Sequence, residues 1–226
     1  MTRVYIVAEG QTEQAFISAV LAPFLGQCGV HVAARLVGPR GRGGGNVTIH
    51  RLRKDICRFL LQEERSVCST MFDYYGLAPD FPGKDRIAAN QSTAAKAETI
   101  ETALRDEIAR EMDSSFDCRR FIPYVQMHEF EGLLFSDPAA LAHSLGNAEL
   151  QTVFREIREG RGIGTPEDIN DGRETCPSRR IEKVCRYDKP ASGIAAAKAI
   201  GLEKMREECP HFSAWVAKLE SLGDKA

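Results

Sequence analysis

Carboxylate side chains follow three separate apolar runs of the sequence, at the point where each run ends: Glu9 and Glu13 in EGQTE, Asp73 in FDYYG, and Glu129 and Glu131 in MHEFEG. Carboxylates brought together repel one another and resist ionisation, and a bound cation removes that cost. Mg²⁺ prefers oxygen ligands and binds through one or two carboxylates, water and substrate phosphates. The pattern therefore predicts a Mg²⁺ or Mn²⁺ site suited to phosphodiester chemistry, in which a metal activates water and stabilises the leaving oxygen.

The elements that must position these carboxylates alternate between strands and helices. Apolar, β-branched runs at 4–8, 30–37, 66–72 and 120–126 are typical of buried strands, although Pro123 argues against a central position for the last of them. Residues at helical spacing lie between them, for example Ile100, Leu104, Ile108 and Met112. Such alternation predicts βαβ units and a mostly parallel sheet of about four strands. In such sheets ligands bind beyond the carboxyl ends of the strands, where all three acidic strings would meet.

The alternation stops after residue 135. Ser136 and Asp137 precede Pro138, a combination that predicts the start of a helix. We therefore expect a Rossmann-like α/β catalytic core over residues 1–135 and a helical extension over 136–226 that packs on it.

The three strings together resemble the Toprim domain of topoisomerases, bacterial primases and OLD-type nucleases, and more closely a bacterial Toprim-like family associated with defence loci. The resemblance covers about residues 3–135, with a weaker likeness in YDKPASG at 187–193. It implies a glutamate after the first strand, here Glu9, and an Asp-x-Asp motif after the third, of which Asp73 matches the first aspartate. It also implies a partner ATPase and a role in anti-phage defence.

One position departs from that family. Tyr75 stands where the second aspartate would be, and a phenol with a pKa near 10 is a poor Mg²⁺ ligand at neutral pH. We expect Glu9 and Asp73 to hold the metal, with Glu129 or Glu131 replacing the missing carboxylate. One of these two glutamates would face the site and the other would form a salt bridge. Weakened catalysis is the other consequence that Tyr75 allows.

Several further side chains have two possible roles each, one functional and one structural. Glu13 is either a ligand or a first-turn acid favoured by the helix dipole. Lys189 either neutralises charge on the scissile phosphate or is a surface lysine before a proline. His128 is a ligand candidate or, more commonly for its type, a hydrogen-bonded loop histidine. Tyr74 and Tyr75 could stack on a base, and packing in the core is the alternative.

Nucleic acid would have to be held by local basic patches, because the net charge is −2. Seven basic residues and a single acid lie between positions 35 and 58. We assign nucleic-acid binding to five of them, with a solvated charged face as the alternative: Arg40, Arg42, Arg51, Arg53 and Lys54.

These features favour a cytoplasmic metal-dependent nuclease acting on DNA or RNA. No apolar run approaches the length of a membrane span, and no G-x-G-x-x-G or Walker-type nucleotide motif is present. A non-catalytic subunit that binds nucleic acid or an ATPase, and a phosphatase or nucleotide hydrolase, are the competing functions. Substrate, metal count and oligomeric state, a homodimer included, stay open.

Overall fold

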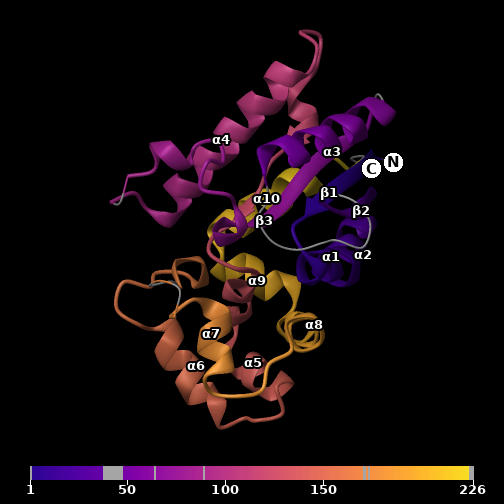
Figure 1. Cartoon of the computed structure of the whole chain (residues 1–226). Coiled ribbons are helices and arrows are strands. Elements are labelled where there is room, and N and C mark those ends of the chain that lie inside the picture. The colour runs from indigo at the N-terminus through magenta and orange to yellow at the C-terminus, as the bar shows by residue number, and fades with distance from the viewer. Residues whose placement is uncertain are drawn as a thin grey trace.

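A parallel β-sheet covered by helices on both faces forms the centre of the molecule in a computed structural model of the chain (Figure 1). The structure describes residues 2–37, 48–63, 65–88, 90–169, 172 and 174–223. A mixed α/β fold with a parallel sheet was predicted from the alternation of apolar runs, and it is confirmed.

Within the described residues the sheet has five strands, and every pairing between them is parallel. The order is β2-β1-β3-β4, and β5 also pairs with β3. Their bounds are β1 (Thr2–Ala8), β2 (Val30–Leu36), β3 (Val67–Asp73), β4 (Phe121–Ile122) and β5 (Val125–Gln126). The central position of β1 and β3 explains why their residues are almost all buried and apolar.

Alternate residues of β1 point to opposite faces of the sheet. On one face Val4, Ile6 and Ala8 join a hydrophobic cluster with α1 (Gln11–Phe16) and α10 (Pro210–Glu220). On the other face Tyr5 and Val7 join a cluster with α3 (Ile49–Gln62) and α4 (Thr93–Glu111). The sheet is thereby fixed between two helical layers, and only its ends are free to carry a site.

The fourth predicted strand, 120–126, is in fact two short strands separated by Pro123 and Tyr124. Proline has no N–H to donate to a strand ladder, so regular pairing stops there. Side chains replace the missing ladder bonds: the Thr70 hydroxyl bonds to both the N–H and the C=O of Tyr124, and Glu101 accepts from the N–H of Val125. After the interruption, Val125 and Gln126 of β5 pair with Phe72 and Asp73, the last residues of β3.

The first helical connection continues from α1 through a π-helical turn, η1 (Ile17–Leu21), into α2 (Ala22–Gln27). Short 3-10 turns follow β3 and precede β4: η2 (Tyr74–Gly76), η3 (Lys84–Arg86) and η4 (Cys118–Arg120). No helix in the described part of the chain is long and apolar enough to cross a membrane.

After β5 the chain is helical, as expected, and most of it forms the lower part of the molecule in Figure 1. Its segments are η5 (Phe130–Ser136), α5 (Pro138–Ser144), α6 (Leu150–Arg158), η6 (Pro166–Asp168), α7 (Pro177–Glu182), α8 (Lys189–Ile200), α9 (Leu202–Glu208) and α10. The predicted cap is confirmed, because the Asp137 side chain accepts from the N–H groups of Ala139 and Ala140.

The last helix returns to the sheet. Trp215 of α10 donates to the Ser69 hydroxyl on β3 and stacks on Tyr124, with 4.2 Å between ring centroids. Thr2 donates to the carbonyl of Leu222, so the described ends of the chain are adjacent. One hydrophobic cluster therefore contains residues from both 1–135 and 136–226.

Candidate metal centre at the carboxyl edge of the sheet

Glu9 and Asp73 meet where β1 and β3 end. The two strands pair in register up to Ala8 and Met71, so the residues that follow leave the sheet side by side. The backbone N–H of Asp73 donates to a carboxylate oxygen of Glu9 over 3.2 Å. The N–H of Glu9 in turn donates to the Met71 carbonyl. The structure thus brings together the two residues expected to anchor a metal.

Two glycines leave room for these carboxylates. A Cβ on Gly76 would overlap both carboxylate oxygens of Glu9, so only glycine fits against that side chain. A Cβ on Gly10 would lie 2.9 Å from the carboxylate of Glu13. Glu13 itself accepts from the N–H of Gly10 over 2.8 Å, as the acid of a capping box does at the start of a helix. The helix-start role considered for Glu13 is therefore present.

Burial and crowding set the protonation of this group. Burial, with the charge of Glu13 next in size, raises the pKa of Glu9 to about 7. Burial raises the pKa of Asp73 well above its usual value, and the charges of Glu13 and Glu9 add to the effect. The Asp73 Oδ1 atom is buried and has no hydrogen-bond partner. Such an orphaned oxygen is unusual in a protein interior and is available to a cation or a water.

Glu129 and Glu131 lie beside this pair and both contact Lys189. The Lys189 ammonium is 3.8 Å from Glu129 and 3.5 Å from Glu131, so the expectation that only one of the two glutamates forms a salt bridge is wrong. Burial raises the pKa of Glu131 to about 7, although the charge of Lys189 opposes the rise. Burial tends to lower the pKa of Lys189, but Glu131 and Glu129 outweigh it and the net shift is upward.

Backbone and ring contacts hold the same two glutamates in place. The N–H of Ser178, at the start of α7, donates to Glu129 over 3.0 Å. The Tyr187 hydroxyl donates to Glu131 over 3.3 Å. A Cβ on Gly193 would lie 2.7 Å from that hydroxyl, so the glycine of YDKPASG makes space for Tyr187. The helical segment thereby supplies part of the site.

The donor set fits a hard cation that keeps most of its water. Within the described ranges, no group of three or more His, Cys, Asp or Glu side chains is spaced to hold a metal ion. The described residues therefore form no closed protein cage of the kind that binds zinc. Mg²⁺ and Mn²⁺ need only one or two carboxylates, with water and substrate oxygens completing the shell. Glu9 and Asp73, with the orphaned Oδ1, suit that mode of binding.

The chain matches one protein family over residues 8–220, nearly its whole length. It belongs to the DUF4276 family. The description of this family is a domain of unknown function. No curated protein and no solved structure matches the chain. The DUF4276 match includes Glu9, Asp73, Glu129, Glu131 and Lys189.

The two tyrosines after Asp73 and the histidine before Glu129 form an aromatic rim in this DUF4276 chain. Ring centroids are 5.7 Å apart for Tyr74 and Tyr75, 6.2 Å for Tyr74 and His128, and 5.6 Å for Tyr75 and His128. Tyr75 is 43% exposed, so core packing is not its role. His128 has φ 66°, alone among the described non-glycine residues, and its buried Nδ1 has no partner. Burial lowers the pKa of His128 to about 4.

Sequence patterns gave no sign of a second lysine near Glu9. Lys84 donates to the Leu77 carbonyl over 2.6 Å, and its ammonium lies 5.1 Å from the centre of the Tyr74 ring. Burial lowers the pKa of Lys84, while the negative charge of Glu9 opposes the shift. The preceding Gly83 has φ 87°, and a Cβ there would lie 2.9 Å from the Thr99 carbonyl oxygen. This turn of the DUF4276 chain therefore holds the Lys84 ammonium over the Tyr74 ring, where the charge of Glu9 acts on it.

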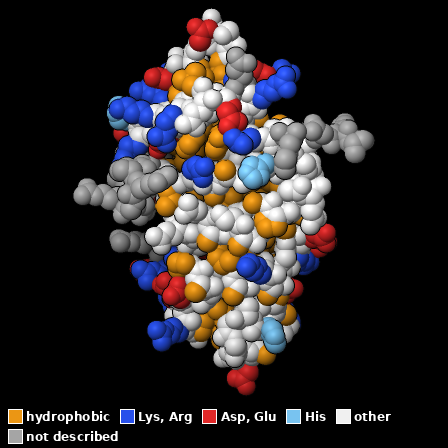
Figure 2. Space-filling model, turned by 90° about the vertical axis from the view of Figure 1, so that its right-hand side faces the viewer, with side chains coloured by type: hydrophobic (Ala, Val, Ile, Leu, Met, Phe, Trp, Pro, Cys, Tyr) orange, Lys and Arg blue, Asp and Glu red, His pale blue; other side chains and the backbone are white. Residues whose placement is uncertain are grey.

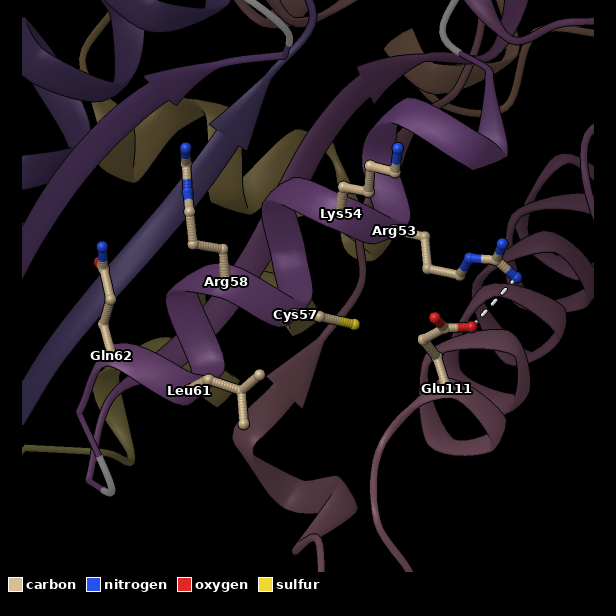
Figure 3. A pocket seen from close by; sticks show the side chains of 7 residues that line it. All are labelled: Arg53, Lys54, Cys57, Arg58, Leu61, Gln62 and Glu111. Atoms are coloured by element: carbon tan, nitrogen blue, oxygen red, sulfur yellow. Dashed lines mark ion pairs between the residues drawn. The ribbon is translucent and has the colours of Figure 1, made fainter.

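Three of the basic residues assigned to nucleic acid, Arg51, Arg53 and Lys54, lie on α3. Arg53 forms ion pairs with Glu107 and Glu111 of α4, at 3.1 and 3.2 Å. Figure 3 shows Arg53 beside Glu111, and Lys54 pointing away from that pair, along a shallow groove of about 480 Å³. Arg51 is exposed on the same helix. Arg40 and Arg42 lie outside the described residues.

Figure 2 shows a second view of the surface, in which Lys and Arg side chains are interspersed with Asp and Glu around hydrophobic atoms. On this face the described residues of the DUF4276 chain do not form one broad field of positive charge. Phosphate binding there would depend on individual cations, which is consistent with the net charge of −2.

A second buried network, also absent from the sequence analysis, ties α4, η6 and α10 together. Glu101 lies 2.9 Å from His211 Nε2, and Glu167 accepts from the N–H groups of His211 and Phe212. The His211 ring stacks on Tyr124 at 4.9 Å between centroids. In the DUF4276 chain this network fixes the last helix against β5, next to the strand end that carries Asp73.

Proposed function

We propose that the protein is a Mg²⁺- or Mn²⁺-dependent phosphodiesterase that hydrolyses DNA or RNA. The observation that carries the proposal is the pairing of Glu9 with Asp73 at the carboxyl edge of the sheet, where Asp73 presents a buried oxygen without a partner. Buried carboxylates with raised pKa values lower the stability of the fold. A bound divalent cation would compensate for that loss, which explains why the group is present.

In this proposal Glu9 and Asp73 hold the metal, with Glu13, Glu129 and Glu131 around them. When bound, the metal would lower the pKa of a coordinated water and offset negative charge on the phosphate. Lys189 would receive a phosphate oxygen in exchange for one of its ion-pair contacts with Glu129 and Glu131. Lys84 lies over the Tyr74 ring and would attract the phosphate backbone. Neither lysine needs to move a proton for this role.

The proposal extends to the cellular setting. The likeness to defence-associated Toprim-like proteins supports a partner ATPase, an anti-phage role and a cytoplasmic location. Arg51 and Lys54 on α3 remain the described candidates for contacts with more distant phosphates, whereas Arg53 is engaged with α4. Purification of the tagged chain from its native host, with and without phage challenge, tests for the ATPase.

A cleavage assay tests the enzyme proposal. Supercoiled plasmid, single-stranded DNA and RNA are incubated with the protein and Mn²⁺, beside Glu9→Gln, Asp73→Asn and the exposed control Glu98→Gln. We expect cleavage by the wild type and by Glu98→Gln, and a loss of at least about 100-fold in Glu9→Gln and Asp73→Asn, since each removes a charge that the transition state needs. Equal cleavage by all four proteins would indicate a contaminant and reject the proposal.

A non-catalytic binding subunit is the second candidate. Tyr75 in place of a second aspartate favours it, and so does the lack of a three-ligand group among the described residues. Binding of nucleic acid without cleavage under any metal condition would support this candidate. Release of phosphate from nucleotides without strand cleavage would instead support a phosphatase or nucleotide hydrolase.

A further inference from the structure

The aromatic rim of Tyr74, Tyr75 and His128 adjoins both halves of the carboxylate site. Tyr74 follows Asp73 directly, and His128 precedes Glu129 directly. The three rings are in mutual contact although Tyr75 and His128 lie 53 positions apart in the sequence. A bound molecule at the carboxylates would therefore have an aromatic surface next to it.

The rim is held firmly and still presents a ring to solvent. His128 keeps a left-handed backbone conformation that is costly for a non-glycine residue and that persists only where the surroundings impose it. Tyr74 is half-buried under the Lys84 ammonium, and His128 is 8% exposed. Tyr75, packed against both of these rings, is 43% exposed. Tyr74 also packs against the hydrophobic cluster of α3 and α4, which fixes the base of the rim.

The combination of an aromatic surface with adjacent cations and a metal site matches the chemistry of a nucleotide. Every base has a π-face that stacks on Tyr or His, and the charged phosphate would lie toward Lys84, Lys189 and the carboxylates. Bases inside a duplex are stacked on each other and offer no face to a side chain. Only a single strand, a strand end or an extruded nucleotide can stack on a protein ring.

We propose that Tyr75, supported by Tyr74 and His128, stacks an unpaired base beside the scissile phosphodiester, so that the substrate is single-stranded nucleic acid. The inference rests on the proposed function for the position of the scissile bond. It gives the tyrosine that replaces the second aspartate a role in substrate selection.

Binding measurements on the full chain test the stacking. The Asp73→Asn background prevents cleavage, and Tyr75→Ala and Tyr75→Phe are compared in it. The probes are a fluorescent oligothymidylate, the same length of abasic sugar–phosphate strand, and a duplex of the same length. Thermal melting of each variant checks that the exposed position tolerates the change.

We expect Tyr75→Ala to weaken binding of oligothymidylate by about 5- to 100-fold, the range for one lost base–aromatic stack, and Tyr75→Phe to stay within about twofold. The abasic strand should bind equally to all three proteins, and the duplex should bind at least about tenfold more weakly than oligothymidylate. An equal loss on the abasic strand, a loss in Tyr75→Phe as large as in Tyr75→Ala, or equal affinity for duplex would each overturn the inference.

The cleavage assay separates this inference from the proposed function. Cleavage that depends on Glu9 but binding that is indifferent to the Tyr75 ring would reject the stacked base and leave the phosphodiesterase intact. Binding that depends on the ring, without any Glu9-dependent cleavage, would reject both the phosphodiesterase and the claim that the base lies beside a scissile bond.

Discussion

The backbone N–H of Asp73 donates to the carboxylate of Glu9 over 3.2 Å, although 64 residues separate the two in sequence. This bond joins the end of β3 to the end of β1 and fixes the direction of the Glu9 side chain. It leaves the Asp73 Oδ1 buried without a partner. Burial of the Glu9 and Asp73 carboxyl groups lowers the stability of the metal-free protein, because their charged forms lose solvation.

Replacing Glu9 by Gln should stabilise the metal-free protein in a pH-dependent way. The pKa of Glu9 is raised from 4.5 to about 7 in the folded state, so the protonated form is favoured by folding. Its contribution to stability is fully present below about pH 4.5 and is lost as pH rises through about 7. Because Gln mimics the protonated acid, the difference between Glu9→Gln and wild type should be near zero at pH 4.5 and reach about 1–3 kcal/mol at pH 8.

Urea unfolding at several pH values, in the presence of a chelator, measures this difference. Glu98→Gln is the matched control, because Glu98 is exposed on α4 and should show no such trend. A Glu9→Gln protein that is less stable than wild type at pH 8 would mean that the charged form of Glu9 is favoured by the fold.

Binding of Mn²⁺ should release protons near neutral pH. A carboxylate must be ionised to hold a metal, and both Glu9 and Glu131 have pKa values of about 7 in the metal-free protein. Calorimetric titrations at pH 6.5 in two buffers of different ionisation enthalpy should give a release of about one proton per metal, falling toward zero at pH 8.5. Identical binding enthalpies in the two buffers at pH 6.5 would contradict the expected coupling.

Substitution of Gly76 by Ala should damage the site without unfolding the protein. The added Cβ would overlap both carboxylate oxygens of Glu9, so that side chain must leave its position. We expect Mn²⁺ affinity and cleavage to fall at least about tenfold, since one misplaced ligand removes much of the binding energy. The melting temperature should change little, because the displaced carboxylate gains solvent.

Gly26→Ala provides the matched control for this change. Gly26 lies in α2, and a Cβ there meets no atom within 4 Å. Alanine in that helix should stabilise the protein by up to about 1 kcal/mol and leave metal binding unchanged. Equal Mn²⁺ affinity in Gly76→Ala and Gly26→Ala would remove Glu9 from the set of ligands.

Loss of the Lys189 charge should destabilise the protein more at alkaline than at acid pH. Glu131 is 1% exposed and lies 3.5 Å from the Lys189 ammonium, so Lys189→Met leaves an unpaired buried carboxylate. The pKa of Glu131, about 7 with the lysine present, should rise further. We expect a cost of about 1–3 kcal/mol at pH 8 and a smaller cost at pH 5.5, where Glu131 is protonated.

Lys198→Met, on the exposed face of the same helix, controls for the loss of a positive charge on α8. Chemical unfolding of both variants at the two pH values is sufficient. If Lys189→Met were as stable as Lys198→Met at pH 8, the ion pairs with Glu129 and Glu131 would contribute nothing to the fold.

The parallel sheet and the pairing of Glu9 with Asp73 could be predicted from the sequence for one physical reason. Buried parallel strands need continuous apolar runs, and the runs that form β1 and β3 each end at a carboxylate residue. Glu9 and Asp73 stand at two such ends, so topology alone brings them to one edge. The register of β1 with β3 then places them in contact.

The remaining contacts depend on loop conformation and on packing between distant segments. Lys84 lies over the Tyr74 ring after a left-handed turn at Gly83, which the string FPGKDR does not specify. Ser178 meets Glu129 across 49 residues, and His211 meets Glu101 across 110. No periodicity encodes such encounters. The predicted strand at 120–126 was wrong in its continuity because the side chains of Thr70 and Glu101, rather than the backbone of a neighbouring strand, satisfy the backbone around Tyr124.

A crystal of the full chain soaked in Mn²⁺, with anomalous diffraction recorded at the manganese edge, tests the central claim most directly. The account predicts an anomalous peak within about 2.1–2.3 Å of carboxylate oxygens from both Glu9 and Asp73, the usual length of Mg²⁺-type ligand bonds, and no peak there in Asp73→Asn. A fully soaked crystal with no peak between these two side chains, or with its only peak elsewhere, would contradict it.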